Sequence, residues 1–264
     1  MTPDPRTMRG TFDAVADLYD RARPTYPPEM FDDLAGAAGL VPGSRVLEIA
    51  CGTGQATLPL AERGYAVEAV ELGAALATLA RRNLAAHPRV RVSVSSFEEW
   101  PLPPEPFDVV LCATAFHWID PAVRLAKSAR ALRAGGWLAV VDTVHVDGGG
   151  TRQLFVDAQA CYLEFDPDTA PGFRLPTVQD VPVERDDLLD AGLFEPPVLH
   201  RYLREVSYST QAYLDVLRTY SSVRRLPPQD QDGLLACLGD LIDTRYAGRL
   251  DMVYLTELRL ARRR

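Results

Sequence analysis

The sequence predicts an α/β protein with a doubly wound, mostly parallel β-sheet. Short apolar runs alternate with longer amphipathic segments between residues 28 and 144, which is the pattern of parallel strands joined by helices. One of these runs, residues 45–50, ends in a glycine turn that opens the next helix, and ligands of open α/β sheets lie at such strand ends. Because crossovers between parallel strands are right-handed, few topologies remain possible.

The first half of the chain supplies most of the predicted strands. Pro27 and Pro28 open a helix that ends near Gly39, because proline suits a first helical turn and glycine suits the position after the last one. Apolar runs too short for helices are read as buried strands. We expect strands at residues 45–50, 66–71, 90–94, 107–113 and 137–144, and helices at residues 55–63, 74–86 and 121–133.

The pattern is looser in the second half. The run Gly148-Gly149-Gly150 marks a hinge-like break, and a loop rich in Pro, Asp and Thr follows over residues 166–182. Periodicity favours two more strands and three more helices there. We expect helices at residues 153–164, 210–222 and 229–246, and strands at residues 194–207 and 249–259.

Charge and hydropathy argue against two classes of partner. Acidic residues outnumber basic ones 36 to 28, whereas proteins that bind nucleic acid normally carry a basic face. We therefore expect no nucleic-acid partner and a solvated run of arginines at Arg259 and Arg262–Arg264. No window holds 18 uninterrupted apolar residues, and residues 1–10 lack the apolar segment of a signal peptide, so we expect a cytoplasmic protein without a membrane partner.

The cysteines form no metal-binding or disulfide pattern. Cys51, Cys112, Cys161 and Cys237 are scattered and show no CxxC spacing. We therefore expect free thiols in a reducing compartment and no metal site.

The turn after the first predicted strand carries the clearest chemical signal. Gly52 and Gly54 allow close approach of a ligand to the backbone, and the following helix offers free N–H groups. Glu71 ends the second strand, 19 residues after Gly52, where a carboxylate can bind ribose hydroxyls of either a nicotinamide cofactor or S-adenosylmethionine. Glu48, just before the glycines, is poorly placed for a pyrophosphate and well placed for an ammonium or sulfonium group.

Four segments together resemble one family, the class I S-adenosylmethionine-dependent methyltransferases. The likeness is to the small-molecule group that contains the ubiquinone and trans-aconitate methyltransferase-like proteins (methyltransferase type 11), and it covers residues 10–145. The segments are Phe12-Asp-x-x-Ala-x-x-Tyr19-Asp with Arg23-Pro-x-Tyr26-Pro, Val46-Leu-Glu-Ile-Ala-Cys-Gly-Thr-Gly54, Phe107-Asp-Val-Val with Phe116-His117-Trp118, and Ala131-Leu-Arg-x-Gly-Gly-Trp-Leu138.

The resemblance implies a Rossmann-like sheet of seven strands, the last one antiparallel, with helical lid elements. The whole of residues 1–264 is then one methyltransferase domain. It divides into N-terminal cap helices over 1–40, a cofactor-binding half over 41–145, a lid or insert over 146–192, and a C-terminal part over 193–264 that completes the sheet.

The same resemblance implies S-adenosylmethionine as cofactor and S-adenosylhomocysteine as product. Ser96 departs from the family, which often has an acidic residue there, so we expect adenine recognition to use the backbone or Glu98. Ala50 stands where the broader motif has a glycine, and we expect its small methyl group to be tolerated. The implied cofactor contacts are Glu48, Ala50, Cys51, Gly52 and Gly54 at the methionine moiety, Glu71 at the ribose, Leu72, Ser96 and Phe97 at the adenine, Ala113 and Thr114 at the sulfonium, and Tyr19 as a cover.

Methyl transfer to an alcohol or a carbon acid needs a base, whereas a phenol, an amine or a carboxylate needs little help. His117, after the fourth strand, is the first candidate base and His145, after the fifth, is the second, because imidazole titrates near neutrality. We expect Tyr26, Trp118 and Phe173 to face the small-molecule acceptor, in a monomer or a homodimer.

Three other functions share part of this pattern. A cyclase that binds the cofactor without transferring methyl would have the same binding residues. A nicotinamide-dependent reductase shares Glu71, but Glu48, the missing third glycine after Gly54 and the lack of a Tyr-x-x-x-Lys pair argue against it. A nucleic-acid methyltransferase is disfavoured by the net charge of −8 and by Ala113-Thr-Ala-Phe116 in place of an Asn/Asp-Pro-Pro-Tyr/Phe tetrapeptide.

Overall fold

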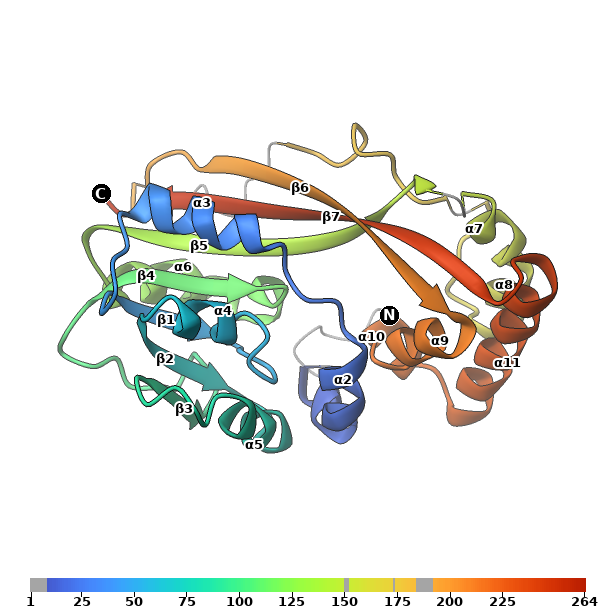
Figure 1. Ribbon diagram of the computed structural model, residues 1–264, viewed down its shortest axis with the longest axis horizontal. Coiled ribbons are helices and arrows are strands. Elements are labelled where there is room, and N and C mark those ends of the chain that lie inside the picture. Colours follow the sequence, from blue (N-terminus) through green and yellow to red (C-terminus); the bar gives the residue numbers. More distant parts are fainter. Residues whose placement is uncertain (1–8, 150–151, 173, 184–191) are drawn as a thin grey trace.

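A seven-stranded sheet forms the centre of the computed structural model, which describes residues 9–149, 152–172, 174–183 and 192–264 (Figure 1). The strands are β1 (Arg45–Ile49), β2 (Ala66–Glu71), β3 (Val90–Val94), β4 (Phe107–Ala113), β5 (Leu132–Val146), β6 (Val198–Ser209) and β7 (Arg249–Arg262). Their order is β3-β2-β1-β4-β5-β7-β6, and β7 runs antiparallel to both of its neighbours. The predicted fold class, a doubly wound and mostly parallel sheet with the last strand antiparallel, is confirmed.

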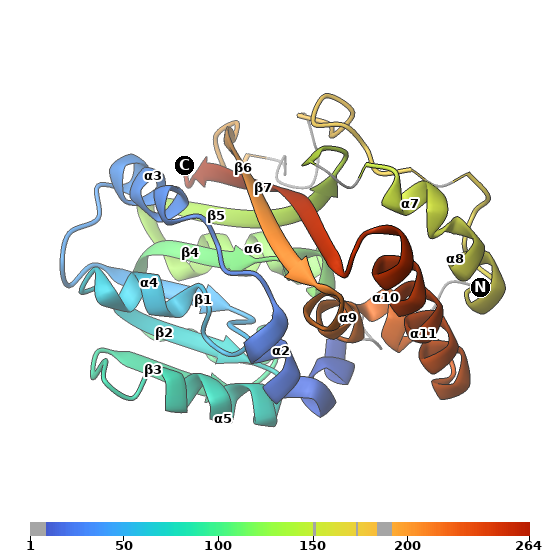
Figure 2. The same ribbon diagram turned by 45° about the vertical axis from the view of Figure 1, so that its right-hand side comes forward.

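Helices cover both faces of the sheet and extend beyond one end of it (Figure 2). Helices α7 to α11, here called the helical cap, gather beside the ends of β6 and β7. The helices are α2 (Ala16–Ala22), α3 (Pro28–Ala38), α4 (Thr57–Glu62), α5 (Ala74–Asn83), α6 (Pro121–Ala131), α7 (Leu154–Asp157), α8 (Gln159–Phe165), α9 (Thr210–Arg218), α10 (Ser221–Arg224) and α11 (Pro228–Arg245), with the short 3-10 helices η1 (Arg9–Val15) and η2 (Phe116–Trp118). Among the described residues, no helix is both long and apolar enough to cross a membrane.

Two apolar clusters hold the helices on the sheet, and a third builds the helical cap. One cluster joins Phe31 of α3 and Leu60 of α4 to strand residues such as Val46. The second joins α6 to the other face through residues such as Leu125. The third lies between the cap helices and the ends of β6 and β7, where Tyr254 is buried. Burial of apolar side chains on both faces explains why the strands read as continuous apolar runs.

The second half of the chain departs from the predicted boundaries. The helix expected at 153–164 is two short helices, α7 and α8, and the helix expected at 210–222 is α9 and α10. Strand β6 begins at Val198, because Phe194 makes only an isolated bridge to Arg263. Strand β5 is longer than predicted at both ends, because Leu132 pairs with β4 and residues 137–146 pair with β7, so His145 lies within β5 and not after it as expected.

The expectation that the C-terminal arginines are solvated is wrong for Arg259. Its side chain is only 2% exposed, because β7 lies inside the sheet between β5 and β6. Its Nη1 lies 2.8 Å from Asp142 Oδ2, and its Nη2 pairs with Glu257, which also binds Arg201 at 2.7 Å. The charge is therefore neutralised inside the protein and is not available to a polyanion.

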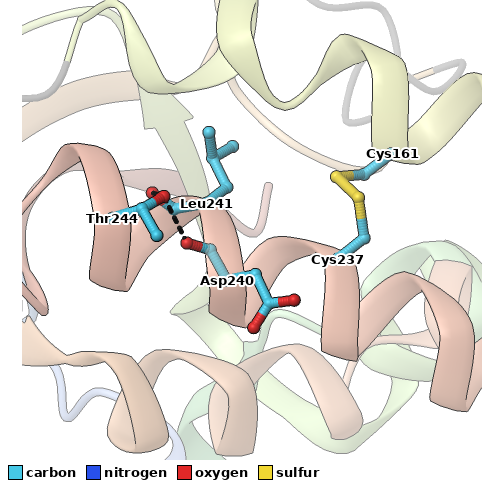
Figure 3. The surroundings of a disulfide bond; sticks show 5 residues. All are labelled: Cys161, Cys237, Asp240, Leu241 and Thr244. Carbon is cyan, nitrogen blue, oxygen red and sulfur yellow. Dashed lines mark hydrogen bonds between the residues drawn. A yellow bond between two sulfur atoms is a disulfide. The ribbon is translucent and has the colours of Figure 1, made fainter.

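The expectation of four free thiols is also wrong, because Cys161 of α8 and Cys237 of α11 form a disulfide (Figure 3). The two residues are 76 positions apart and meet only where α8 packs against α11, so no local spacing could reveal the pair. Cys51 and Cys112 are free and buried in the α/β half.

Candidate cofactor and acceptor site

A pocket of about 490 Å³ opens at the carboxyl ends of the parallel strands. Its floor comes from residues at and just after the ends of β1, β2 and β4 and from residues 142–145 of β5, and its walls come from the segment 12–26 and from α10 of the helical cap. Its volume lies within the range of about 300–1,000 Å³ typical of small-molecule sites. No cluster of His, Cys, Asp and Glu in the described part of the chain could hold a metal ion.

The turn after β1 presents bare backbone to this pocket. Gly52 has a φ of 59°, and its backbone lies beneath the Tyr19 ring, whose Cε1 would be 3.7 Å from a Cβ added there. Gly54 does not line the pocket; with a φ of 91° it shapes the turn, and a Cβ there would press on Leu84 at 3.0 Å. Cys51 lines only a small adjoining cavity of about 20 Å³.

Glu71 braces the turn from the end of β2. Its Oε2 accepts a hydrogen bond from Gly52 N at 2.9 Å, and its Oε1 accepts one from Gly73 N at 2.8 Å. Burial raises the pKa of this carboxyl, while the backbone donors oppose that rise. The carboxylate is thus fixed in orientation at the pocket wall, where it can accept further hydrogen bonds from a diol.

Glu48 lies behind the same turn and faces the small cavity rather than the main pocket. Its side chain is 1% exposed, and its Oε2 has no hydrogen-bond partner in the described structure. Burial raises its pKa to about 8, because the charged form is poorly solvated there. A buried hydrogen-bond acceptor without a partner destabilises the folded protein, and a cationic ligand would supply the missing interaction.

The wall beyond β2 and β3 is suited to a flat ring. Leu72 is 39% exposed at this wall, and Ser96 and Phe97 line it as well. Glu98 also lines the pocket, where its Oε1 accepts a hydrogen bond from Asp120 N at 3.1 Å.

The N-terminal segment covers the pocket with aromatic side chains. Phe12 packs edge-on against both Tyr19 and Trp118, at 6.2 and 6.0 Å between ring centres. Tyr26 Oη lies 3.1 Å from Thr114 Oγ1, which ties the segment to the end of β4. Ala113 and Thr114 line the pocket at that strand end.

Both candidate bases line the pocket, but they differ in exposure. His117 is exposed on η2 and packs against Trp118, with 4.6 Å between ring centres. His145 is partly buried, and its Nε2 lies 3.0 Å from Tyr220 Oη. Burial, reinforced by the nearby positive charge of Arg23, lowers the pKa of His145 to about 4. Its imidazole is therefore neutral at pH 7, and the same lowered pKa makes it a weak base there.

The structure adds pocket residues that sequence reasoning missed. Gln55 follows the glycine turn, and its Nε2 donates to Arg23 O at 3.3 Å. Arg23 was visible in the motif Arg23-Pro-x-Tyr26-Pro, but the motif assigned it no role. The cap and the outer strands contribute Tyr220, Ser221, Ser222, Arg204, Tyr254 and Thr256, and β5 contributes Asp142 and Thr143.

Of the residues predicted to contact cofactor or acceptor, most therefore share one pocket. Glu48 and Cys51 adjoin it through the small cavity, and Gly54 shapes its turn. Phe173 lies outside the described residues. The predicted residues that do line the pocket are Tyr19, Tyr26, Ala50, Gly52, Glu71, Leu72, Ser96, Phe97, Ala113, Thr114, His117, Trp118 and His145.

Sequence comparisons place this chain among methyltransferases. A family model described as a methyltransferase domain matches residues 46–136. An uncharacterized methyltransferase of Geobacillus kaustophilus is 32% identical over 164 residues, which are 59% of this chain and 75% of that protein. An uncharacterized methyltransferase of Mycobacterium tuberculosis is 40% identical over 141 residues, or 53% of this chain. The chain spans 55% of the length of this mycobacterial relative.

Solved structures share the whole architecture. A protein from Anaeromyxobacter dehalogenans, described as a candidate type II methyltransferase, has a TM-score of 0.60 and 28% identity, and the match covers 91% of this chain and 97% of that one. The cyclase SpnF has a TM-score of 0.56 at 17% identity over 99% of this chain and 97% of its own, a likeness of fold alone. The chain belongs to the class I S-adenosylmethionine-dependent methyltransferase family.

Proposed function

We propose that this protein transfers the methyl group of S-adenosylmethionine to an O, N or C atom of a small-molecule acceptor and releases S-adenosylhomocysteine. The observation that carries the proposal is Glu48, a buried carboxyl group with an unpartnered Oε2 directly behind the glycine turn. A cationic amino-acid end would stabilise the ionised carboxylate and supply the missing partner, whereas the pyrophosphate of a dinucleotide would disfavour its ionisation.

The residues of the pocket fit the rest of this cofactor. Glu71 can hold the ribose hydroxyls, because its oxygens are already oriented by Gly52 and Gly73. Leu72 and Phe97 offer apolar surface to the adenine. Gly52 leaves the backbone bare for the methionine moiety, and Tyr19 covers it.

S-adenosylmethionine, when bound, supplies a methyl group on a positively charged sulfur. The contribution of the chain is to align an acceptor with that methyl group and to keep water out. Tyr26 and Thr114, joined by their hydroxyl groups, hold the N-terminal segment over the strand ends, and Phe12 and Trp118 close the rim.

His145 and His117 are the proposed bases. His145 is neutral at pH 7 and can accept a hydrogen bond at Nε2 from an acceptor or from the Tyr220 hydroxyl, but its lowered pKa makes it a weak base, suited to an acceptor that loses its proton readily. His117 is exposed at the rim and is suited to an acceptor that enters beside Trp118.

The electrostatics support a small acceptor. The formal charge is −8, and Arg259, which could have contributed to a basic surface, is buried in ion pairs. Of the alternative functions, a cyclase-type protein would use the same cofactor contacts, and the fold likeness to SpnF is compatible with it. The methyltransferase relatives, which share more sequence with the chain, favour methyl transfer.

Calorimetric titration tests the cofactor. The wild-type protein, titrated with S-adenosylmethionine, S-adenosylhomocysteine, NADH and NADPH, is expected to bind only the first two. Replacement of Glu71 by Ala should weaken the binding of S-adenosylmethionine and of S-adenosylhomocysteine by about 10- to 100-fold, which is the effect of losing charge-assisted hydrogen bonds.

The matched control is Glu68→Ala, on the same strand β2 but outside the pocket, where the carboxylate pairs with Arg91. This variant should bind like the wild type. Binding of a nicotinamide cofactor, or of none of the four compounds, would refute the proposal.

A further inference from the structure

Four charged side chains form a network across the outer strands of the sheet. Glu257 of β7 is the direct register partner of Arg201 on β6 and of Asp142 on β5. Two carboxylates therefore lie opposite each other, which is unfavourable without a cation between them. Arg259 supplies that cation, because its Nη1 donates to Asp142 Oδ2 at 2.8 Å and its Nη2 pairs with Glu257. Arg201 binds the other oxygen of Glu257 at 2.7 Å, so two positive and two negative charges balance.

The middle of this network is buried, and one end of it reaches the pocket. The side chains of Glu257 and Arg259 are 0% and 2% exposed, whereas that of Asp142 is 20% exposed. Asp142 lines the pocket, and the other three residues do not. A buried ion pair often stabilises a fold no better than apolar side chains of similar volume. The network is therefore better explained by what it does for Asp142 than by stability.

Asp142 lies on the acceptor side of the proposed cofactor site. The sheet order places β5 on the side of β4 away from β1, β2 and β3, and the proposed contacts to the methionine, ribose and adenine moieties follow those three strands. Thr114, which is expected at the sulfonium, donates its backbone N–H to Val141 O at 2.7 Å. Asp142 is the next residue along β5. It therefore borders the part of the pocket just beyond the sulfonium, where an acceptor must approach.

The chemistry of this wall suits a ligand that donates hydrogen bonds. An ionised carboxylate only accepts hydrogen bonds and has about four lone-pair sites, so the bond from Arg259 orients Asp142 without saturating it. Neutral hydroxyl groups line the pocket as well: Thr143 Oγ1 lies 3.4 Å from Thr256 Oγ1, and Ser221 belongs to the wall formed by α10. An amine or a hydroxyl group is compatible with these partners, whereas a carboxylate next to Asp142 would be repelled.

We propose that Asp142 is an acceptor-recognition residue, that Arg259 positions its carboxylate, and that the acceptor carries an amine or a hydroxyl group beside the atom that receives the methyl group. This inference rests on the function proposed above. Asp142 recognises the donor group through a charge-assisted hydrogen bond, which is stronger than a neutral one. Arg259 acts through Asp142 and does not touch the acceptor.

Binding of small probes to protein saturated with S-adenosylhomocysteine tests the class of acceptor. Benzylamine, benzyl alcohol and benzoate share one ring and differ in the polar group that it carries, and ligand-observed NMR gives their dissociation constants. The wild type should bind benzylamine or benzyl alcohol at least about tenfold more tightly than benzoate. Asp142→Asn keeps the size of the side chain and removes its charge, and it should reduce this preference by about tenfold. The probe that loses more affinity in this variant identifies the donor group as an amine or a hydroxyl.

The matched control is Asp108→Asn. Asp108 lies on the neighbouring strand β4, where it pairs with Arg133 at 2.7 Å outside the pocket. This variant should bind all three probes like the wild type. Both aspartate variants should also bind S-adenosylhomocysteine like the wild type, because neither residue belongs to the proposed cofactor contacts.

Arg259→Met tests the positioning role. Its preference for the amine or alcohol over benzoate should fall as it does in Asp142→Asn, and Arg259→Lys, which keeps a charge between the two carboxylates, should restore part of it. This ratio of affinities does not depend on the fraction of protein that is folded. If circular dichroism shows that Arg259→Met does not fold, Arg259→Lys decides, with a ratio between those of the wild type and Asp142→Asn.

The possible results separate this inference from the function on which it rests. A wild-type preference for benzoate would overturn it and would point to Arg204, the pocket residue on β6, as the recognition residue. A wild type that binds S-adenosylhomocysteine but neither benzylamine nor benzyl alcohol, or an unchanged preference in Asp142→Asn, would overturn it too. Wild-type ratios in both Arg259 variants would reject the positioning role. Failure of the wild type to bind S-adenosylhomocysteine would instead refute the underlying function.

Discussion

Ala50 and Thr114 show how single residues adapt the strand ends to a ligand. Both have left-handed backbones, with φ values of 56° and 55°, and they end the neighbouring strands β1 and β4 inside the pocket. A left-handed conformation costs a residue with a side chain about 1–2 kcal/mol. Such strain commonly persists at functional sites, where the surrounding structure enforces it. The resemblance implies a glycine at the position of Ala50, and a left-handed backbone is the geometry that glycine adopts without strain.

At the residue scale, Glu48 predicts that cofactor binding is linked to pH. With its pKa raised to about 8, the carboxyl of the free protein is mostly protonated at pH 7. A cationic ligand favours the ionised form, so binding should release close to one proton at pH 7. Affinity should rise by up to about tenfold per pH unit between about pH 6 and 7, and should fall above about pH 8, where the α-ammonium group of the ligand loses its proton. His145, with a pKa of about 4, titrates outside this window.

Calorimetry in buffers of different ionisation enthalpy measures this proton release directly. The observed enthalpy of S-adenosylmethionine binding should depend on the buffer for the wild type and not for Glu48→Gln. A wild-type enthalpy that is the same in phosphate and Tris buffers would contradict the prediction.

Only part of the site could be predicted from the sequence. Gly52 and Glu71 were recognisable because a strand end, a tight turn and a second strand end follow each other at fixed spacing. Arg23 and Tyr220 could not be assigned, because they meet only through contacts between α2 and the cap, nearly 200 positions apart. Periodicity describes an element and its neighbours, and it carries no information on such distant packing.

At the scale of elements, β7 explains several differences between prediction and structure. Its place between β5 and β6 extends the pairing of β5 to Val146 and buries Arg259. The sequence pattern of β7 predicted a strand but not its place in the sheet. A run of arginines is normally exposed, and only the pairing with Glu257 and Asp142 makes burial of Arg259 possible.

The disulfide of the helical cap is predicted to stabilise the folded state. Cys161 and Cys237 close a loop of 76 positions, for which chain-entropy arguments give about 4 kcal/mol. The double variant Cys161→Ser/Cys237→Ser should lose about that much free energy of unfolding in guanidinium chloride. The wild type in excess reductant should behave like the variant, and reductant should not affect the variant. Four reactive thiols in the denatured, unreduced wild type would contradict the prediction.

At the scale of the whole molecule, the pocket joins three regions that are distant in sequence. The strand ends form its floor, while residues 12–26 and residues 220–222, which contact each other through Arg23 and Tyr220, form walls. Helix α2 contacts both α5 on the sheet and α9 in the cap, and the views agree that it lies between them (Figures 1 and 2). A ligand in the pocket therefore contacts all three regions at once.

This arrangement predicts that cofactor binding protects the walls as well as the floor. S-adenosylhomocysteine at 100 times its Kd should raise the free energy of the opening motions that destroy the site by about 2.7 kcal/mol. Hydrogen exchange through those openings should therefore slow by about 100-fold. Hydrogen exchange followed by mass spectrometry should show slower exchange over residues 12–26, 50–54 and 219–222. Residues 90–94 of β3, outside the pocket, serve as the internal control. Protection confined to 50–54 would show that the walls do not engage the cofactor.

The place of β7 also bears on how the chain folds during synthesis. In the described part of the chain, strand β6 pairs only with β7, which is synthesised after it, so residues 198–209 leave the ribosome before their partner exists. During that interval β5 is an uncovered sheet edge, and such edges invite pairing with other chains. The parallel strands β1 to β5 can assemble as synthesis proceeds. Strand β6 and the cap helices beside it can join this sheet only after residues 249–262 have paired with β5 as strand β7. Nascent chains stalled before residue 249 should therefore be the species that chaperones must shield.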